Sequence, residues 1–295
     1  MKHVINIDNH CILDNKNKQL IIHKGLETIQ VPIEDIISIV IDANGVAIKK
    51  EIISLCAEFG VLIYFSDSKH LPQSIIIPMH GNVLQTKTLL NQINFIPSHS
   101  GILWRDIIKS KIKNQHKLCT FYKIPSNVFF NFYDNIQEND TTNIEAQAAK
   151  IYFKLIFGDD FIRDRDMNGI NLFLNYSYAL IRGLVARSIC STGLNPALGI
   201  HHHNQYDPMP LASDLMEPFR PFSDHMVIKL IKNGKFEHAG LTKEVKENLI
   251  KIFTEPCTVD GKATTLEYAV RLYVSSIKKY IEDQNEIILF PELCL

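Results

Sequence analysis

The feature that most constrains the fold is a change in the spacing of apolar residues near Pro78. Before it, short runs rich in β-branched residues alternate with turn-forming residues, which is typical of strands. After it, apolar residues recur at i, i+3 and i+4, which is typical of helices. We therefore expect an α+β protein with a β-rich domain over residues 1–78 and a larger α-helical domain over residues 79–295.

The elements expected before Pro78 are short. Turns are expected from Asp14 to Asn17 and at Lys24 and Gly25, and one helix from Lys49 to Glu58 is expected to end at Gly60. The predicted strands cover residues 3–7, 19–23, 27–31, 36–41, 61–65 and 74–77. Farther along the chain, helices are predicted around residues 89–93, 104–112 and 268–277, and polar loops at 136–142 and 257–263.

Charge and hydropathy limit the classes of function. The formal net charge of −1 argues against nucleic-acid binding, because proteins dedicated to it are usually basic. However, all seven Arg follow residue 100 and four of them lie between Glu145 and His202, so a neutral total is compatible with a local basic face. No apolar run approaches the ~18 residues of a membrane span, and the N-terminus lacks a signal-peptide pattern. We expect a cytoplasmic protein with no membrane partner.

A loop from Gly193 to His203 carries three consecutive His and precedes two acidic residues, Asp214 and Glu217. The i, i+3 spacing of the acidic pair places both on one face of a helix. Imidazole and carboxylate groups together can hold a divalent metal, and the best further ligand upstream is Glu145. Two structural alternatives remain: Thr142 and Glu145 fit a capping box, and Asp214 fits a charge at a helix N-terminus.

Several strings occur in the order found in one known family, and over roughly residues 1 to 285 the chain resembles the CRISPR-associated spacer-acquisition integrases. The doubled His after Ile200 and the string from Met216 to Pro221 resemble the type II branch of that family. The strings that carry the resemblance lie at residues 111–115, 145–153, 175–180, 193–202 and 214–221.

This resemblance implies an N-terminal β-sandwich followed by a larger all-helical catalytic domain. It implies a metal-dependent DNA endonuclease and integrase of CRISPR adaptation, which uses Mg²⁺ or Mn²⁺. In the reaction, a 3′-hydroxyl of a captured DNA fragment attacks a phosphodiester at the CRISPR repeat. The implied partners are double-stranded and branched DNA, a second copy of the chain bound through the β-rich domain, a small ferredoxin-like adaptation protein that bridges two dimers, and other type II CRISPR proteins.

The resemblance also assigns roles to residues. It implies that Glu145, His202 and Glu217 are the catalytic metal ligands, and we expect their side-chain tips to converge within about 5 Å. Which of Tyr176 and Tyr178 lines the site stays open. The residues expected to contact DNA or to orient the ligands are Asp214, Arg220, Arg163, Arg165, Arg182, Asn175, Tyr176, Tyr178, His201 and His203.

Three alternatives are retained. The chain could be a non-catalytic DNA-binding scaffold with a decayed metal site, or a metal-dependent phosphohydrolase of small nucleotides. The second would favour a His-Asp dipeptide, whereas this chain has the reverse order, Asp224-His225. Finally, the basic stripe Arg105, Lys109, Lys113 and Lys117 has the spacing of a solvated helix face but would also suit a phosphate track.

Overall fold

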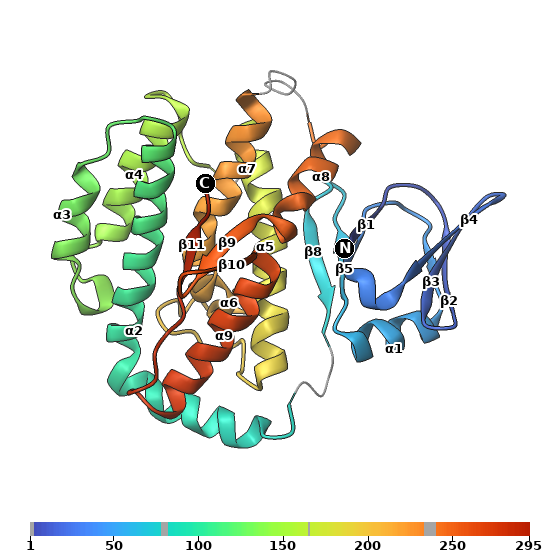
Figure 1. The fold of residues 1–295 in the computed structure, drawn as a ribbon, viewed down its shortest axis with the longest axis horizontal. Helices are drawn as coiled ribbons and strands as arrows, with labels where there is room; N and C mark the ends of the chain where they lie inside the picture. The colour runs from blue at the N-terminus through green and yellow to red at the C-terminus, as the bar shows by residue number, and fades with distance from the viewer. Residues whose placement is uncertain (1–2, 78–81, 165, 233–239) are drawn as a thin grey trace.

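The computed structural model describes residues 3–77, 82–164, 166–232 and 240–295, so the predicted joint at Pro78 lies outside the described residues. The described chain begins with short strands and one α-helix, seen on the right of Figure 1, which confirms the expected β-rich start. These elements are β1 (His3–Ile7), β2 (Ile12–Lys16), β3 (Gln19–Lys24), β4 (Glu27–Pro32), η1 (Ile33–Asp35), β5 (Ile36–Ile41), β6 (Ala47–Ile48), α1 (Lys50–Phe59), β7 (Leu62–Ser66) and β8 (Pro72–Ile76).

The strands form two sheets, with the orders β1-β5-β7-β8 and β4-β3-β2-β6. Apolar side chains of both sheets and of α1, among them Leu13, Ile39 and Ile52, pack into one core cluster. The other face of the first sheet packs on the helical part, where the Tyr64 hydroxyl donates to the carbonyl oxygen of Leu180 at 2.6 Å. Strand β5 is therefore covered on both faces, which explains its continuous apolar run.

In this part of the chain, local patterns predicted the end of α1 correctly but misplaced one turn. Gly60 has a φ of 68° and ends α1 in the left-handed conformation, as expected. The turn expected from Asp14 to Asn17 is wrong, because Asp14 pairs with Ile21 inside the β2–β3 ladder. The chain reverses one step later, at Asn17 and Lys18, whose φ angles are 51° and 58°. The polar side chains of β2 are compatible with this pairing because none of them is fully buried: Asp14 and Asn15 are half-buried and Lys16 is exposed.

The rest of the described chain is mainly helical, as expected, and none of its helices is long and apolar enough to cross a membrane. The central helix α5 packs against α6, α7, α8 and α9 (Figure 1). The α-helices are α2 (Gln85–Phe121), α3 (Val128–Asn135), α4 (Ile144–Phe157), α5 (Ile170–Thr192), α6 (Pro210–Leu215), α7 (Arg220–Lys232), α8 (Lys243–Ile250) and α9 (Leu266–Glu282). The 3₁₀ turns are η2 (Glu138–Asp140), η3 (Glu217–Phe219) and η4 (Lys251–Thr254).

The expectation that this part is all-helical is wrong. Strands β9 (Pro256–Val259), β10 (Lys262–Thr265) and β11 (Pro291–Leu293) form an antiparallel sheet in the order β10-β9-β11. The segment expected to be a polar loop is thus a hairpin, which turns at Asp260 and Gly261 with φ angles of 49° and 71°. An Asp-Gly pair is the signal of such a tight hairpin turn.

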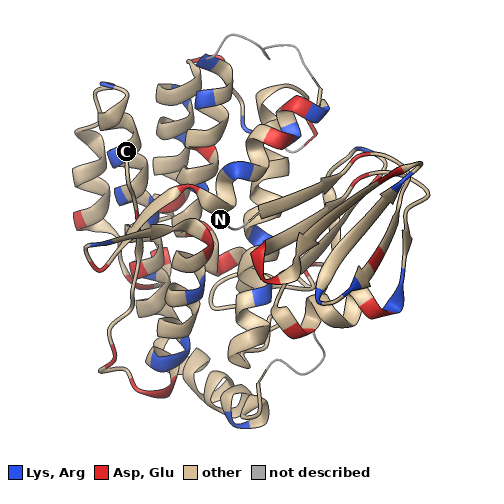
Figure 2. Ribbon diagram, turned by 45° about the vertical axis from the view of Figure 1, so that its right-hand side comes forward, with Lys and Arg blue, Asp and Glu red and all other residues tan. Residues whose placement is uncertain are grey.

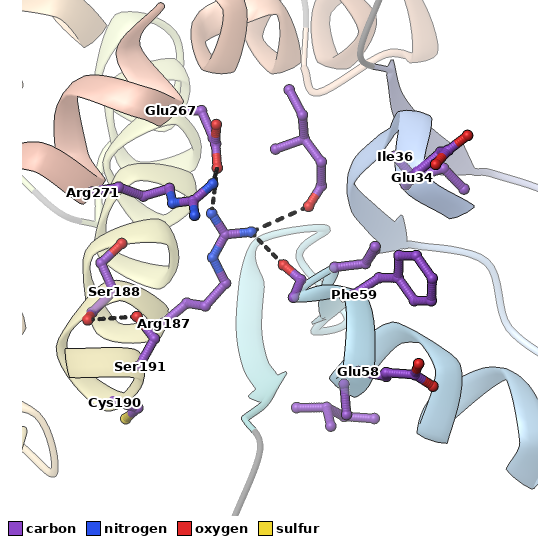
Figure 3. Close-up of a pocket in the computed structure, with 15 residues that line it drawn as sticks. Glu34, Ile36, Glu58, Phe59, Arg187, Ser188, Cys190, Ser191, Glu267 and Arg271 are labelled. Carbon is purple, nitrogen blue, oxygen red and sulfur yellow. Dashed lines mark hydrogen bonds and ion pairs between the residues drawn. The ribbon is translucent and has the colours of Figure 1, made fainter. Parts of the chain in front are cut away.

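A cavity of about 530 Å³ lies where the strand-rich part meets α5 and α9, and its lining includes Arg187, Glu267 and Glu34 (Figure 3). Arg187 on α5 crosses this junction. Its guanidinium donates to the carbonyl oxygen of Gly60 at 2.7 Å and pairs with Glu267 on α9 at 2.8 Å. The Arg187 side chain therefore links three elements that are distant in sequence.

We expect Arg187→Ala to lower the free energy of unfolding by about 3 kcal/mol, because Glu267, only 7% exposed, loses its close partner. Urea unfolding measures this change. The matched control is Arg271→Ala: this side chain is 55% exposed and lies 3.9 Å from the same carboxylate, so its loss should cost less than ~0.5 kcal/mol. Equal effects of the two variants would contradict the proposed role of Arg187.

Candidate functional site

Two acidic side chains predicted as ligands meet at a buried lysine. Glu145 lies in the first turn of α4, and Glu217 begins η3, between α6 and α7. The Nζ of Lys111, on α2, lies 2.6 Å from Glu145 Oε1 and 2.6 Å from Glu217 Oε2. The side chains of Lys111 and Glu217 are 6% and 3% exposed, whereas Glu145 is 28% exposed. The fold therefore gathers two carboxylates around one position that holds a positive charge.

The N-terminus of α4 does not use Glu145 as a cap. The Asp140 carboxylate accepts the backbone N–H of Ile144 at 2.8 Å and of Glu145 at 2.9 Å. The N-cap residue of α4 is Asn143 rather than Thr142, and Asp140 rather than Thr142 accepts the Glu145 N–H, so the capping box suggested by Thr142 and Glu145 does not form. Because Asp140 satisfies these amides, the Glu145 side chain is available to Lys111.

Glu217 is ionised although it is buried. Its Oε1 accepts a hydrogen bond from Arg220 Nε at 2.7 Å. Burial acts to raise the pKa of Glu217, but the charges of Arg220 and Lys111 outweigh burial and lower the pKa to about 2. Its Oε2 lies 2.6 Å from the Lys111 ammonium, so each oxygen of this carboxylate faces a cation.

Asp214 organises the histidine loop. It is fully buried, and its carboxylate accepts the backbone N–H groups of Ile200 at 2.6 Å, His201 at 3.0 Å and His202 at 3.2 Å. It also contacts His202 Nδ1 at 2.5 Å. A Cβ at Gly199 would lie 2.3 Å from the His202 carbonyl oxygen, so this close approach requires glycine. The alternative of Asp214 as a helix N-terminal charge is wrong, because Asp214 lies near the end of α6.

The three histidines have different surroundings. Asp214 holds Nδ1–H of His202, which leaves Nε2 as the nitrogen with a free lone pair. The same hydrogen bond raises the pKa of His202, and the charges of Glu217 and Glu145 act in the same direction. His201 stacks on Trp104, with ring centroids 4.3 Å apart, and burial lowers its pKa. His203 is exposed. His202 is thus the histidine that the fold orients.

Of the two tyrosines, Tyr178 is the one in contact with the arginines near Glu217. The Arg220 guanidinium lies 4.7 Å from the centroid of the Tyr178 ring, and that of Arg163 lies 5.4 Å from it. Arg163 also donates to Asn175 Oδ1 at 2.7 Å. Tyr176 is fully buried on another face of α5, where burial raises its pKa. Tyr178 therefore positions arginines, and Tyr176 belongs to the core.

The other cationic residues predicted to contact DNA lie farther from Lys111 and the two glutamates or outside the described residues. Arg182 pairs with Asp207 at 2.5 Å and donates to Ser213 at 3.2 Å, so it holds the segment that leads into α6. Arg165 lies outside the described residues. Figure 2 shows Lys and Arg on the same helices as Asp and Glu. In the basic stripe of α2, Arg105 pairs with Asp106 and Lys117 lies 3.5 Å from Glu292, which favours a solvated helix face.

The sequence analysis predicted helical segments within α2 but missed what this helix contributes to the site. Gln92 donates to the carbonyl oxygens of Asn195 and Leu198 in the histidine loop. Asn114 donates to the carbonyl oxygens of Pro218 and Pro291 at 3.0 Å each. Together with Lys111 and Trp104, these side chains contact the histidine loop, Glu145 and the turn that carries Glu217. The family string at residues 111–115 pointed to this helix, but it did not indicate that Lys111 is buried between the two carboxylates.

The chemistry of Glu145, Glu217 and His202 suits the binding of a divalent ion. Among the described residues, no three His, Cys, Asp or Glu side chains stand close enough to form a metal cluster as they are placed, and the Lys111 ammonium lies between the two carboxylates. Nevertheless, the carboxylates of Glu145 and Glu217 and the Nε2 of His202 are ligand types that Mn²⁺ and Mg²⁺ accept. The convergence of all three tips stays a prediction.

A second buried carboxylate next to this site should make stability depend on pH. Asp224 is 1% exposed and accepts the hydroxyls of Tyr152 and Tyr178 at 2.8 and 2.5 Å. Burial raises its pKa from 3.8 to about 6. The folded state therefore binds the proton more tightly than the unfolded state, so this group's contribution to stability is lost as pH rises from about 4 to 6.

We expect the stability of the wild type relative to Asp224→Asn to fall by about 2–3 kcal/mol between pH 4 and pH 7, at ~1.4 kcal/mol per pKa unit. Urea unfolding of both proteins across this range measures the difference. The variant cannot ionise at this position, so it removes the contribution of Asp224 while other groups titrate equally. Parallel pH profiles for the two proteins would show that Asp224 has an ordinary pKa.

The fold of this chain is shared with solved structures. The structure matches a casposase bound to integration product with a TM-score of 0.79 and 20% identity, over 98% of this chain and 92% of that chain. It also matches a Cas6-RT-Cas1–Cas2 complex with a TM-score of 0.72 and 16% identity, over 96% of this chain and 35% of that chain. At these identities the matches show a shared fold.

The sequence then gives the family. The model of the family described as CRISPR associated protein Cas1 matches residues 5–254, and the chain belongs to this family. A relative from Neisseria meningitidis, the CRISPR-associated endonuclease Cas1, is 34% identical over 95% of this chain and 92% of its own length.

Proposed function

We propose that this protein is a metal-dependent DNA endonuclease and integrase of CRISPR adaptation, which inserts short foreign DNA fragments into the CRISPR array by transesterification at the repeat. Membership of the Cas1 family and relatives named endonucleases support this function. The observation that carries it is the meeting of Glu145 and Glu217, 72 residues apart (217 − 145), at one buried position.

We infer that Glu145, Glu217 and His202 Nε2 hold the divalent ion, Mn²⁺ or Mg²⁺. When bound, such an ion stabilises the negative charge that develops on a phosphate under attack. The imidazole ligand makes Mn²⁺ at least as suitable as Mg²⁺, which prefers oxygen ligands. Glu217 is already ionised and Asp214 already orients the ring of His202, which supports both residues in this role.

The arginines near the site would bind DNA phosphates. Arg220 is held by Glu217 and by the Tyr178 ring, and Arg163 by Asn175 and the same ring. Guanidinium groups fixed in this way lose little conformational freedom when they bind a phosphate. They would position the strand, while the carboxylates and His202 serve the chemistry.

The partners follow from the family and its structural neighbours. We propose double-stranded and branched DNA as substrate, a homodimer formed through the β-rich residues 1–78 as a sandwich domain, and residues 79–295 as the catalytic domain. We further propose a small ferredoxin-like partner bridging two dimers, supported by the fold match to a complex that contains Cas2. Further type II proteins and a cytoplasmic location complete the proposal.

Strand transfer tests this function directly. The substrate is a branched DNA with a free 3′-hydroxyl, incubated with the protein and Mn²⁺, and the product is a joined strand. We expect transfer with Mn²⁺ and none after chelation with EDTA. DNA binding without transfer would favour the scaffold, and hydrolysis of nucleoside phosphates without transfer would favour a phosphohydrolase.

A further inference from the structure

Lys111 is a cation at the centre of a site that the proposed function assigns to a metal. Its Nζ lies 2.6 Å from one oxygen of Glu145 and 2.6 Å from one oxygen of Glu217. Oxygen ligands lie about 2.0–2.1 Å from Mg²⁺. An ion that bonded both oxygens would therefore need the place that the ammonium now holds.

The charge of Lys111 is maintained by these same contacts. Lys111 is 6% exposed, and the two carboxylates in contact with it favour its charged form over the neutral amine. Without this charge, two carboxylates would face each other in a region that is largely shielded from water. Lys111 thus keeps the two acidic groups together when no ion is bound.

The backbone around Lys111 is fixed independently of its side chain. One turn later on α2, Asn114 donates to the carbonyl oxygens of Pro218 and Pro291 and accepts the N–H of Leu293 at 3.1 Å. Pro218 follows Glu217 directly, so this contact ties α2 to the turn that carries Glu217. The position of α2 relative to this turn therefore does not depend on the Lys111 side chain alone.

We propose, on the basis of the proposed metal site, that Lys111 is a built-in counter-ion: it holds Glu145 and Glu217 in place before metal binds, and the metal must displace its ammonium. The ion then binds a state in which Lys111 has moved away. Since that state is only a fraction of the metal-free protein, the apparent affinity for metal is reduced by that fraction. Removal of the charge without loss of side-chain length should therefore increase metal affinity.

The test measures metal binding rather than activity. Mn²⁺ is titrated into wild type, Lys111→Met and Lys111→Arg, and free Mn²⁺ is followed by electron paramagnetic resonance. We expect Lys111→Met to bind Mn²⁺ at least ~10-fold more tightly than wild type, and Lys111→Arg to stay close to wild type. The matched control is Lys113→Met, because Lys113 is an exposed lysine on the same helix; its affinity should be unchanged.

Two further variants make the result specific. Adding Glu217→Gln to Lys111→Met should abolish the gain, because the gain arises at this carboxylate. If Lys111→Met does not fold, Lys111→Gln replaces it with the same expectation, since its amide can still donate to the carboxylates. Equal or weaker Mn²⁺ binding by a folded charge-free variant would overturn the proposal.

The proposed function and this inference can fail separately. Tighter Mn²⁺ binding by Lys111→Met in a protein that never transfers strands would refute the integrase and leave the counter-ion in place. Normal transfer by wild type with no gain in Mn²⁺ affinity would refute the counter-ion alone.

Discussion

His202→Ala and Glu217→Gln should each reduce Mn²⁺-dependent strand transfer by at least ~10³-fold, because the loss of a metal ligand removes several kcal/mol of charge stabilisation in the transition state. DNA binding should change less than about threefold, because Arg and Lys supply most phosphate contacts. The measurements are strand transfer on branched DNA and equilibrium binding to the same DNA at one fixed salt concentration. Glutamine keeps the shape of Glu217, so this variant separates charge from packing.

The matched control is His203→Ala, which removes an exposed imidazole next to His202 and should retain transfer within about threefold. Undiminished transfer by His202→Ala would contradict the assigned ligand. It would support a different ligand among His201, His203 and Asp214.

Asp214→Ala should lower the free energy of unfolding by about 3–5 kcal/mol, because it leaves three backbone amides and the imidazole of His202 without their buried acceptor. Strand transfer should also fall by about 10- to 100-fold at temperatures where the variant is folded, since His202 loses its orientation. Urea unfolding and transfer assays measure the two effects.

The conservative variant Asp214→Asn separates these roles. An amide oxygen can still accept part of the loop's hydrogen bonds, so stability should fall less than in Asp214→Ala, while the pKa of His202 should lose the increase caused by the carboxylate. Nuclear magnetic resonance titration of His202 measures that pKa. A loss of less than ~1 kcal/mol in Asp214→Ala would show that the loop is held by other contacts.

Much of the secondary structure follows from local patterns. The apolar run of β5 and the helix that ends at Gly60 were predicted because strand and helix periodicity act over a few residues. Strand β2 was missed because its polar residues resemble a turn, and only its pairing with β3 makes it a strand. The β9–β10 hairpin was missed although Asp260 and Gly261 carried its signal.

The sequence by itself determined the candidate ligand types of the proposed site, carboxylate and imidazole, together with the loop that presents His202. Only the tertiary structure decided which groups meet. Lys111 lies 34 residues before Glu145 (145 − 111) and 106 before Glu217 (217 − 111), yet it touches both. No local pattern encodes such a contact, because it depends on how α2, α4 and η3 pack. For the same reason, packing alone placed Tyr178 beside Arg220 and assigned the cap of α4 to Asp140.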